Sequence, residues 1–309
     1  MTDVAPLPRG VTVLERGWLS SNNVVFTTGV TSVVDTGYFT HSAQTLALVQ
    51  RELAGNALQS IVNTHLHSDH CGGNAALQAA YPGSRLLIPP GQADAVARWD
   101  EAQLSYTETG QSCARFSFDG VLRPGASVLL GESHWEVHAA PGHDPHSVIL
   151  FEPDERALIS ADALWENGFG VVFPELDGAS AFDEVGATLD VIEALAPRLV
   201  VPGHGSPFAG REKVGAAIAR ARSRLARFVA NPSRHASHAM KVLVKFKLLE
   251  WQRVEFEQLV RWAEGMPYMR RVHSRFFGDA PLRDWLDEMT AELTKSGALG
   301  REGSIVYNI

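Results

Sequence analysis

The sequence predicts an α/β fold over residues 1–208 and a mostly helical module over residues 209–309. In the first part, short apolar runs bounded by glycine or proline alternate with helical patterns, as expected when helices cover β-sheets. In the second part, long stretches carry apolar residues three and four positions apart. The charge changes at the same point. Residues 1–208 hold 9 arginines, no lysine and 24 acidic residues, a net charge of −15, and residues 209–309 hold 18 basic and 11 acidic residues, a net charge of +7.

The composition limits the class of protein further. The 309 residues are 45% hydrophobic and 20% charged with a net charge of −8, which excludes a predominantly disordered chain. Two cysteines, Cys71 and Cys113, are too few for a disulfide scaffold. No apolar run reaches the roughly 18 residues of a membrane-spanning helix, and residues 1–6 lack the pattern of a secretory leader. We therefore expect a cytoplasmic protein with no membrane partner.

Strands and helices are expected to alternate through the first part of the chain. Apolar runs bounded by glycine, proline or polar residues predict strands. These cover residues 11–14, 23–26, 32–34, 60–63, 84–88, 127–130, 135–139, 147–151, 157–160 and 199–201. Apolar residues at spacings of three and four predict helices, which cover residues 42–53, 73–80 and 181–194.

The second part is expected to be helical with one closing strand. An alanine- and arginine-rich helix is predicted at residues 211–230, and Ser233 is expected to cap the helix that follows. Further helices at residues 254–263 and 281–295 precede a strand at residues 303–307. Helices followed by a short β-ribbon fit a winged-helix-like module, and a plain helical cap fits equally well.

One segment carries most of the chemical information. Residues 63–73 read Asn-Thr-His-Leu-His-Ser-Asp-His-Cys-Gly-Gly and place four candidate metal ligands, His65, His67, Asp69 and His70, within six residues. Because side chains alternate along a strand, His65 and His67 can point the same way. Asp69 and His70 follow on the turn into the next helix. Imidazoles with a carboxylate form a donor set that suits zinc.

Three further candidate ligands lie at the ends of predicted strands. His143 follows the first segment in a Pro-Gly-His turn, Asp162 lies 19 residues later, and His204 follows after another 42 residues in a second Pro-Gly-His turn. Loops at strand ends place functional side chains on a rigid scaffold. Seven ligands exceed one tetrahedral site and fit two metal ions that share one ligand.

These motifs, in this order and spacing, resemble those of the metallo-β-lactamase superfamily of metallo-hydrolases. The resemblance extends from about Val11 to Pro207 and includes the strand and turn at residues 33–37. It implies an αββα sandwich with the active site at one edge between the two sheets. Some members, including a branch with endoribonuclease activity, carry a C-terminal winged-helix-like extension, which residues 209–309 resemble in layout.

The resemblance also implies the metal content and a role for each ligand. Two divalent ions are expected, Zn²⁺ first, with Mn²⁺ and Fe²⁺ as alternatives. A bridging water would become a hydroxide near neutral pH and attack a carbonyl or phosphoryl centre, and Asp69 would shuttle a proton. The first metal would be held by His65, His67 and His143, the second by Asp69, His70 and His204, and Asp162 would bridge the two.

Individual residues indicate which branch of the superfamily the chain resembles. His67 stands where the flavodiiron redox branch usually has Glu, which favours a hydrolase. Asp162 favours the glyoxalase II, lactonase and ribonuclease Z branches over zinc β-lactamases. Trp165 occupies the position where acyl-homoserine-lactone lactonases tend to have Tyr. No glutathione-binding set of basic residues and Tyr is recognised after His204, which weakens a strict glyoxalase II assignment. Asp35 either orients the histidine loop or simply caps a turn.

Candidate pocket residues follow Asp162 in an aromatic loop that borders the substrate pocket in this family. Trp165, Phe169 and Phe173 are expected to contact an apolar part of a substrate, with local core packing as the alternative. His146 either lines the pocket or is a histidine that supports the site from behind or lies on the surface.

Other features have plainer interpretations. Cys71 is expected to be a buried, inert thiol, and His235 and His238 are expected to be surface histidines. The arginines at positions 220, 222, 224 and 227 fit a solvated helix face, with anion binding as the alternative.

The leading function is hydrolysis of a small ester, thioester or lactone by a dinuclear zinc centre. One alternative is a metal-dependent endoribonuclease that uses the basic second part to hold phosphates, although the acidic first part disfavours nucleic acid as a partner. A second is a mononuclear iron dioxygenase of the persulfide dioxygenase type, and a third is a DNA-binding regulator. The expected partner is a small-molecule substrate, and a homo-oligomer stays open.

Overall fold

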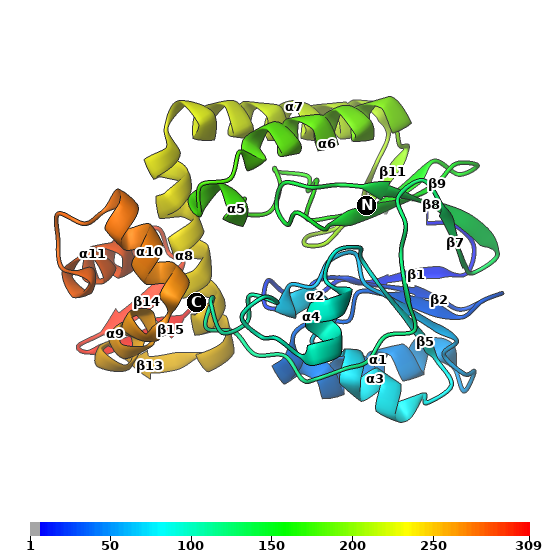
Figure 1. Ribbon diagram of the computed structural model, residues 1–309, viewed down its shortest axis with the longest axis horizontal. Helices are drawn as coiled ribbons and strands as arrows, with labels where there is room; N and C mark the ends of the chain where they lie inside the picture. The colour runs from blue at the N-terminus through cyan, green and yellow to red at the C-terminus, as the bar shows by residue number, and fades with distance from the viewer. Residues whose placement is uncertain (1–6) are drawn as a thin grey trace.

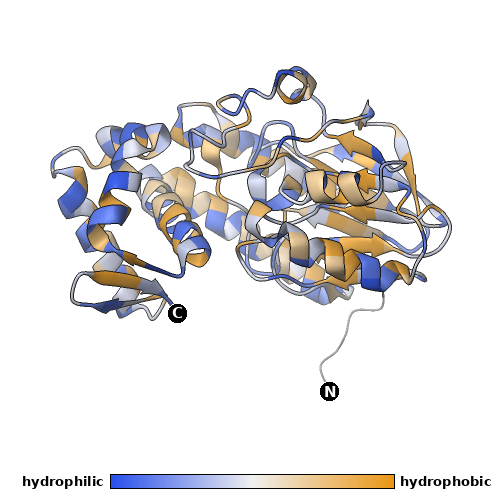
Figure 2. Cartoon of the chain, turned by 90° about the horizontal axis from the view of Figure 1, so that it is seen from below, coloured by the Kyte–Doolittle hydropathy of each residue, from blue (hydrophilic) through white to orange (hydrophobic). Residues whose placement is uncertain are grey.

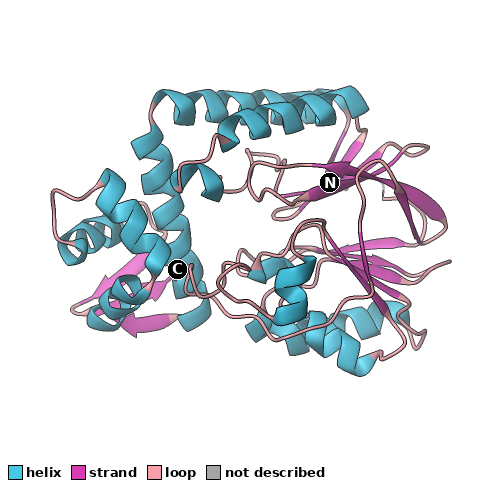
Figure 3. Ribbon diagram, in the orientation of Figure 1, coloured by secondary structure: helices cyan, strands magenta, loops and turns pink. Residues whose placement is uncertain are grey.

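In the computed structural model, which describes residues 7–309, two six-stranded sheets lie face to face between two layers of helices (Figure 1). The expectation of no leader concerns residues 1–6, outside this range. Figure 3 shows the layers by secondary structure, with helices on the outer faces of both sheets. The αββα arrangement expected from the sequence is confirmed.

The first sheet contains the N-terminal strands in sequence order. Its first three strands pair antiparallel, and from β3 onward the pairs are parallel. The strands are β1 (Val11–Leu14), β2 (Asn23–Phe26), β3 (Ser32–Val34), β4 (Ser60–Val62), β5 (Arg85–Ile88) and β6 (Gly120–Val121). The helices α1 (Ser42–Leu53), α3 (Asn74–Ala80) and α4 (Ala93–Arg98) cover its outer face.

The second sheet has the strand order β12-β11-β10-β9-β8-β7. Its pairs are antiparallel except for the parallel pair β10–β11. The strands are β7 (Ser127–Leu130), β8 (Ser133–Ala139), β9 (Val148–Glu152), β10 (Ala157–Ala161), β11 (Leu199–Pro202) and β12 (Phe208–Ala209). The helices α6 (Ala181–Leu195) and α7 (Arg211–Ala230) cover this sheet.

Alternation along the strands builds the layers. In β3, Val33 packs beneath the helices of the first sheet, whereas Val34 packs between the two sheets. In β10, Leu158 packs against the helices of the second sheet and Ile159 packs between the sheets. Because successive side chains point to opposite faces, each two-sided strand must be apolar throughout. Figure 2 shows the strands of the sandwich as predominantly hydrophobic.

Helix α7 joins the sandwich to the C-terminal module. Its apolar side chains belong to the same buried cluster as those of α6, and Figure 1 shows the two helices side by side. The division of the chain into residues 1–208 and 209–309 stays a prediction.

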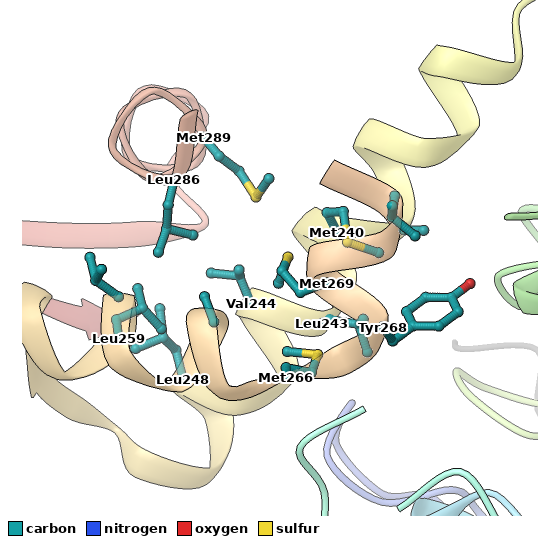
Figure 4. Close-up of a cluster of buried hydrophobic side chains, with 14 of the residues drawn as sticks. Met240, Leu243, Val244, Leu248, Leu259, Met266, Tyr268, Met269, Leu286 and Met289 are labelled. Atoms are coloured by element: carbon teal, nitrogen blue, oxygen red, sulfur yellow. The ribbon is translucent and has the colours of Figure 1, made fainter. Parts of the chain in front are cut away.

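The C-terminal module has its own apolar core (Figure 4). Its small sheet has the order β13-β15-β14 and lies beside four helices. The elements are α8 (Pro232–Trp251), β13 (Arg253–Glu255), α9 (Phe256–Gly265), α10 (Pro267–Phe276), α11 (Leu282–Lys295), β14 (Leu299–Glu302) and β15 (Ile305–Asn308). The helical character is confirmed. Three elements, β13, α10 and β14, are additional to the predicted set, and the winged-helix-like assignment stays a prediction.

The predicted cap of α8 was wrong. Asn231, not Ser233, stands at the N-cap, and its side-chain oxygen accepts a hydrogen bond from the backbone N–H of Arg234 at 3.1 Å. Pro232 occupies the first turn, where its missing N–H costs nothing. The helix therefore begins at Pro232, and Ser233 already lies inside its first turn.

The assignment of His235 to the surface was also wrong, whereas His238 is half-buried on the wall of a cavity. His235 is fully buried on α8, where its Nε2 accepts the N–H of Val172 at 3.3 Å. Its ring lies 5.1 Å from that of Phe182 and 4.8 Å from that of Phe228. Burial lowers the pKa of both histidines to about 4. Spacing along α8 alone could not reveal the aromatic residues that α6 and α7 contribute.

In the part of the chain that the structure describes, no helix is both long and apolar enough to cross a membrane.

Cys71 and Cys113 form no disulfide. Both are buried, with their Sγ atoms 3.8 Å apart. Burial raises the pKa of the Cys71 thiol well above its usual value, as expected for an inert thiol.

Replacing Asn231 with alanine should destabilise the protein by about 1 kcal/mol, because the first turn of α8 loses its side-chain acceptor. The matched variant Ser233→Ala should leave stability unchanged, since Ser233 is exposed. The midpoint of urea unfolding measures both. Equal midpoints for the two variants would contradict the assignment of the cap.

Candidate metal centre

The candidate ligands lie where several strands end at one edge of the sandwich. His65 and His67 follow β4, and Asp162 comes directly after β10. His143 and His204 follow β8 and β11 on short turns. Because β10 runs parallel to β11 and antiparallel to β9, the ends of β8, β10 and β11 lie at the same edge. The topology therefore brings together side chains that are far apart in the sequence.

All seven predicted ligands converge in the structure. They form three overlapping groups, in each of which the donor atoms lie within 4.8 Å of one another. The rings of His65 and His70 are only 3.9 Å apart between centroids. The groups are His65, His67 and His143; His65, His70 and Asp162; and Asp69, His70 and His204.

His70 is oriented by a buried carboxylate from the first sheet. It lies on the short helix α2 (Ser68–Cys71), and its Nδ1 donates to Oδ2 of Asp35 at 2.8 Å. Asp35 also accepts hydrogen bonds from the backbone N–H of Thr64 at 2.9 Å and from its hydroxyl at 2.8 Å. With Nδ1 engaged, Nε2 of His70 is directed toward Asp162, 3.4 Å from its Oδ1. Asp35 thus fixes the tautomer and the direction of His70.

His143 is held in a similar way by a backbone carbonyl. Its Nδ1 donates to the carbonyl oxygen of Val171 at 2.5 Å. Its Nε2 lies 2.8 Å from Nδ1 of His67 and 3.3 Å from Oδ2 of Asp162. A Cβ on Gly170 would lie 2.5 Å from the ring of His143, so only glycine fits beneath this imidazole.

Three of the imidazoles are neutral at pH 7. Burial lowers the pKa of His67 and His143 to about 4 and lowers that of His65 well below its usual value. A neutral imidazole offers a lone pair, which is the form that binds metals.

His70 and Asp162 form the charged centre of the site. Burial lowers the pKa of His70, but the carboxylates of Asp35, Asp162 and Asp69 outweigh burial and raise the pKa well above its usual value. Burial raises the pKa of Asp162, but His70 and then His204 outweigh it and hold the pKa well below its usual range. The surrounding carboxylates therefore favour a positive charge at this point.

The donor set fits divalent metal ions. Nε2 of His65 and Nε2 of His70 are buried without a hydrogen-bond partner among residues 7–309. Such atoms are costly to bury unless something pairs with them. A Cβ on Gly203 would lie 2.2 Å from Oδ1 of Asp162 and 3.0 Å from the ring of His70, so glycine keeps open the space where the donor atoms meet.

A cavity of about 990 Å³ opens from this site toward the C-terminal module. The four predicted pocket residues, His146, Trp165, Phe169 and Phe173, all lie on its wall. Phe169 also belongs to the buried core beneath α6, so it both lines the cavity and packs in the core. Trp165 donates from Nε1 to Oδ1 of Asp162 at 3.2 Å, a contact that the sequence does not indicate.

Several cavity residues were missed by sequence reasoning. Trp18 is 58% exposed and stacks on His204, with ring centroids 5.4 Å apart. Asp144 places Oδ2 3.7 Å from Nε2 of His67, and its position next to His143 was the available signal. Tyr268 comes from α10, and no local pattern connects it with the site.

The C-terminal module holds the loop that borders the cavity. The hydroxyl of Tyr268 donates to the carbonyl oxygen of Phe173 at 2.8 Å. Phe173 begins the short helix α5 (Phe173–Leu176), and its ring lies 5.5 Å from that of His67. Arg271 pairs with Asp177 at 3.1 Å just after α5. The cavity is thus bordered by both parts of the chain.

Comparison with known proteins identifies one family. A sequence profile described as "Metallo-beta-lactamase superfamily" matches residues 16–204, more than half of the chain. This stretch contains all seven candidate ligands.

Individual relatives have different activities. The chain is 25% identical over 230 residues to a linear primary-alkylsulfatase of Pseudomonas sp., covering 63% of the chain and 43% of the relative. It is 28% identical over 149 residues to a hydroxyacylglutathione hydrolase of Hyphomonas neptunium, covering 44% and 50%. It is 29% identical over 171 residues to the acyl-coenzyme A thioesterase MBLAC2 of Homo sapiens, covering 50% and 58%. The chain therefore spans about half the length of the curated relatives it matches.

Solved structures share the fold. The metallo-beta-lactamase family protein TTHA1429 from Thermus thermophilus matches with a TM-score of 0.58 at 19% identity, over 98% of this chain and 100% of that one. The protein TTHA1623, solved in a di-iron-bound form, matches with a TM-score of 0.53 at 27% identity, over 67% of this chain and 96% of that one.

Replacing Asp35 with asparagine should weaken divalent metal binding about 10- to 100-fold, because His70 loses the carboxylate that orients it. The fold should persist, since Asp35 has a positive φ of 57°, which asparagine tolerates. Competition with a chromophoric chelator measures the affinity. Asp154→Asn, at an exposed turn, is the control, and equal affinities in the two variants would contradict the role of Asp35.

Proposed function

This chain belongs to the metallo-beta-lactamase superfamily, and on that premise we propose that it is a metal-dependent hydrolase whose substrates are thioesters. Small esters and lactones belong to the same class of reaction, attack of water on an acyl carbon. The observation that carries the proposal is a complete donor set of five imidazoles and two carboxylates at the end of a large cavity.

Thioesters are favoured within this class by two relatives. The hydroxyacylglutathione hydrolase matches 44% of the chain and the acyl-coenzyme A thioesterase matches 50% of it. The cavity of about 990 Å³ is at the upper end of the range for small-molecule sites, roughly 300–1,000 Å³. Such a volume suits a substrate with both an acyl group and an extended thiol group.

We propose that His65, His67 and His143 hold one divalent ion and Asp69, His70 and His204 a second, with Asp162 shared between them. When bound, such ions supply a water of lowered pKa and polarise the acyl oxygen. The di-iron form of TTHA1623 supports two metals and leaves iron beside zinc and manganese as the native ion.

One of these ligands would also transfer a proton, and two aromatic side chains would contact the substrate. Asp69 borders the cavity with 15% of its side chain exposed, compared with 7% for Asp162. It is therefore the carboxylate that a proton of the attacking water can reach. Trp165 and Phe173 offer apolar walls on either side of the ligands, where an acyl group would exclude water.

Endoribonuclease and iron dioxygenase activities remain alternative predictions, and the Pseudomonas relative adds sulfate esters to the substrates to be tested. One iron per chain with oxygen consumption would favour the dioxygenase. Strongly salt-dependent binding of RNA would favour the nuclease.

The metal-loaded protein should hydrolyse S-acyl thioesters, and removal of metal by a chelator should abolish the activity until metal is restored. Asp69→Asn should lower kcat about 10²- to 10⁴-fold, since it removes a group that transfers a proton. A thiol-reactive chromophore follows product release. The exposed Asp154→Asn variant is again the control.

Failure of the metal-loaded protein to cleave any thioester, ester or lactone would contradict the proposed function. Cleavage of an alkyl sulfate alone would move the assignment to sulfate esters.

A further inference from the structure

Four cationic side chains line the cavity, and two of them form ion pairs with a carboxylate. Lys241 pairs with Glu292 at 2.5 Å, and Arg271 pairs with Glu108 at 2.6 Å. The remaining two are Lys245 and Arg224. Lys245 donates to Oδ1 of Asn308 at 2.5 Å and to two carbonyl oxygens near the C-terminus.

Arg224 has no such partner. Its side chain is half-buried on α7, and within residues 7–309 it makes neither an ion pair nor a hydrogen bond. Burial and the neighbouring cation Arg227 both lower the pKa of its guanidinium. An arginine nevertheless stays charged at neutral pH. A half-buried charge without a counter-ion costs free energy. Binding of an anion beside Arg224 would offset that cost.

Arg224 lies against the turn that carries Trp165. A Cβ on Gly168 would lie 2.6 Å from Cζ of Arg224, which places the guanidinium directly on the backbone of this turn. Within the turn, the N–H of Trp165 donates to the carbonyl oxygen of Gly168 at 2.7 Å. The indole of Trp165 in turn contacts Asp162. The turn at residues 165–168 and the side chain of Trp165 thus connect Arg224 with the candidate ligand Asp162.

Two further nitrogen-bearing side chains share this corner of the cavity with Arg224. His238 and Lys241 lie on α8 and line the same cavity. Burial, Arg224 and Lys241 together lower the pKa of His238 to about 4, so its imidazole is neutral at pH 7. Lys241 is paired with Glu292, which leaves Arg224 as the cation of this group without a carboxylate partner in the described part of the chain. We call Arg224, His238 and Lys241 the basic corner.

We propose that the basic corner binds an anionic group of the substrate, a carboxylate or a phosphate, with Arg224 as its main contact. This inference rests on the proposed function and specifies it: the substrates would be acidic thioesters, with the acyl carbon at the ligands and the charge at Arg224. A planar guanidinium suits both anions because it donates two parallel hydrogen bonds.

Matched substrate pairs test the inference and separate the two anions. S-Butanoyl-4′-phosphopantetheine and S-butanoylpantetheine differ only by a phosphate. S-Butanoyl-3-mercaptopropionate and the corresponding amide differ in the charge of the carboxylate. The wild-type protein should show a higher kcat/KM for the anionic member of at least one pair, and the preferred pair identifies the anion.

Arg224→Gln should lower that preference about 10- to 150-fold, as expected for the loss of a charge-assisted hydrogen bond. Arg224→Lys should retain part of it, because the charge remains. Arg227→Gln is the control, since Arg227 lies exposed on the same helix and contacts Ser223 instead of the cavity. An unchanged preference in Arg224→Gln would overturn the inference while leaving the proposed function intact.

Calorimetry provides a readout that does not require catalysis. The thioether analogue S-butyl-4′-phosphopantetheine should bind the wild-type protein more tightly than S-butylpantetheine does, and rising salt should reduce the difference. The S-butyl analogues of 3-mercaptopropionate and its amide test the carboxylate. Equal binding of both members of both pairs would overturn the inference even if no thioester were cleaved. Absence of cleavage with charge-selective binding would overturn the proposed function alone.

Discussion

Convergence of two carboxylates and five imidazoles at a single edge of the sandwich is the constraint on which the site depends. An apolar sandwich tolerates such charges only when each has a partner. Asp35 supplies a partner on one side by accepting from His70. The space kept open by Gly203 lies on the other side, where the unpartnered nitrogens of His65 and His70 are buried. The convergence depends on three features of the fold. They are the strand order, the buried polar residues behind the candidate ligands and the glycine turns.

The C-terminal module completes the cavity that leads to this centre. Helix α7 shares a core with α6, and α8 continues from it along the cavity wall. Tyr268 and Arg271 of α10 hold the segment that begins with Phe173. Because these contacts come from the far end of the chain, the second part of the chain helps to form the cavity beside the candidate ligands. Substrate choice would then follow from the module, in keeping with the rule that function resides in sites added to a fold.

The layers and the clustering of the candidate ligands were predictable from sequence because both depend on local patterns. Strands such as β3 and β10 are apolar on both faces and end at glycine or polar residues, and the ligands lie directly after strand ends. Contacts between distant segments were not predictable. The burial of His235 depends on Phe182 and Phe228 from two other helices. The cap at Asn231 was missed because Ser233 has the same local propensity, and only backbone geometry distinguishes them.

Residues on the cavity wall illustrate the same limit. Arg224 belongs to a helix with four other arginines and looks like part of a solvated face, yet it lines the cavity without a counter-ion among the described residues. Trp18 stacks on His204 from a loop near the start of the chain. Neither position has a sequence signal of its own, because each acquires its role only when distant segments pack together.

The most direct test of the metal centre is elemental analysis of protein purified without added metal, with Asp162→Ala measured beside it. Two divalent ions that share one carboxylate predict about two equivalents of zinc, manganese or iron per chain in the wild type and fewer in the variant. A well-folded protein that contains no metal and takes up none on titration would contradict the assignment of these seven residues as ligands.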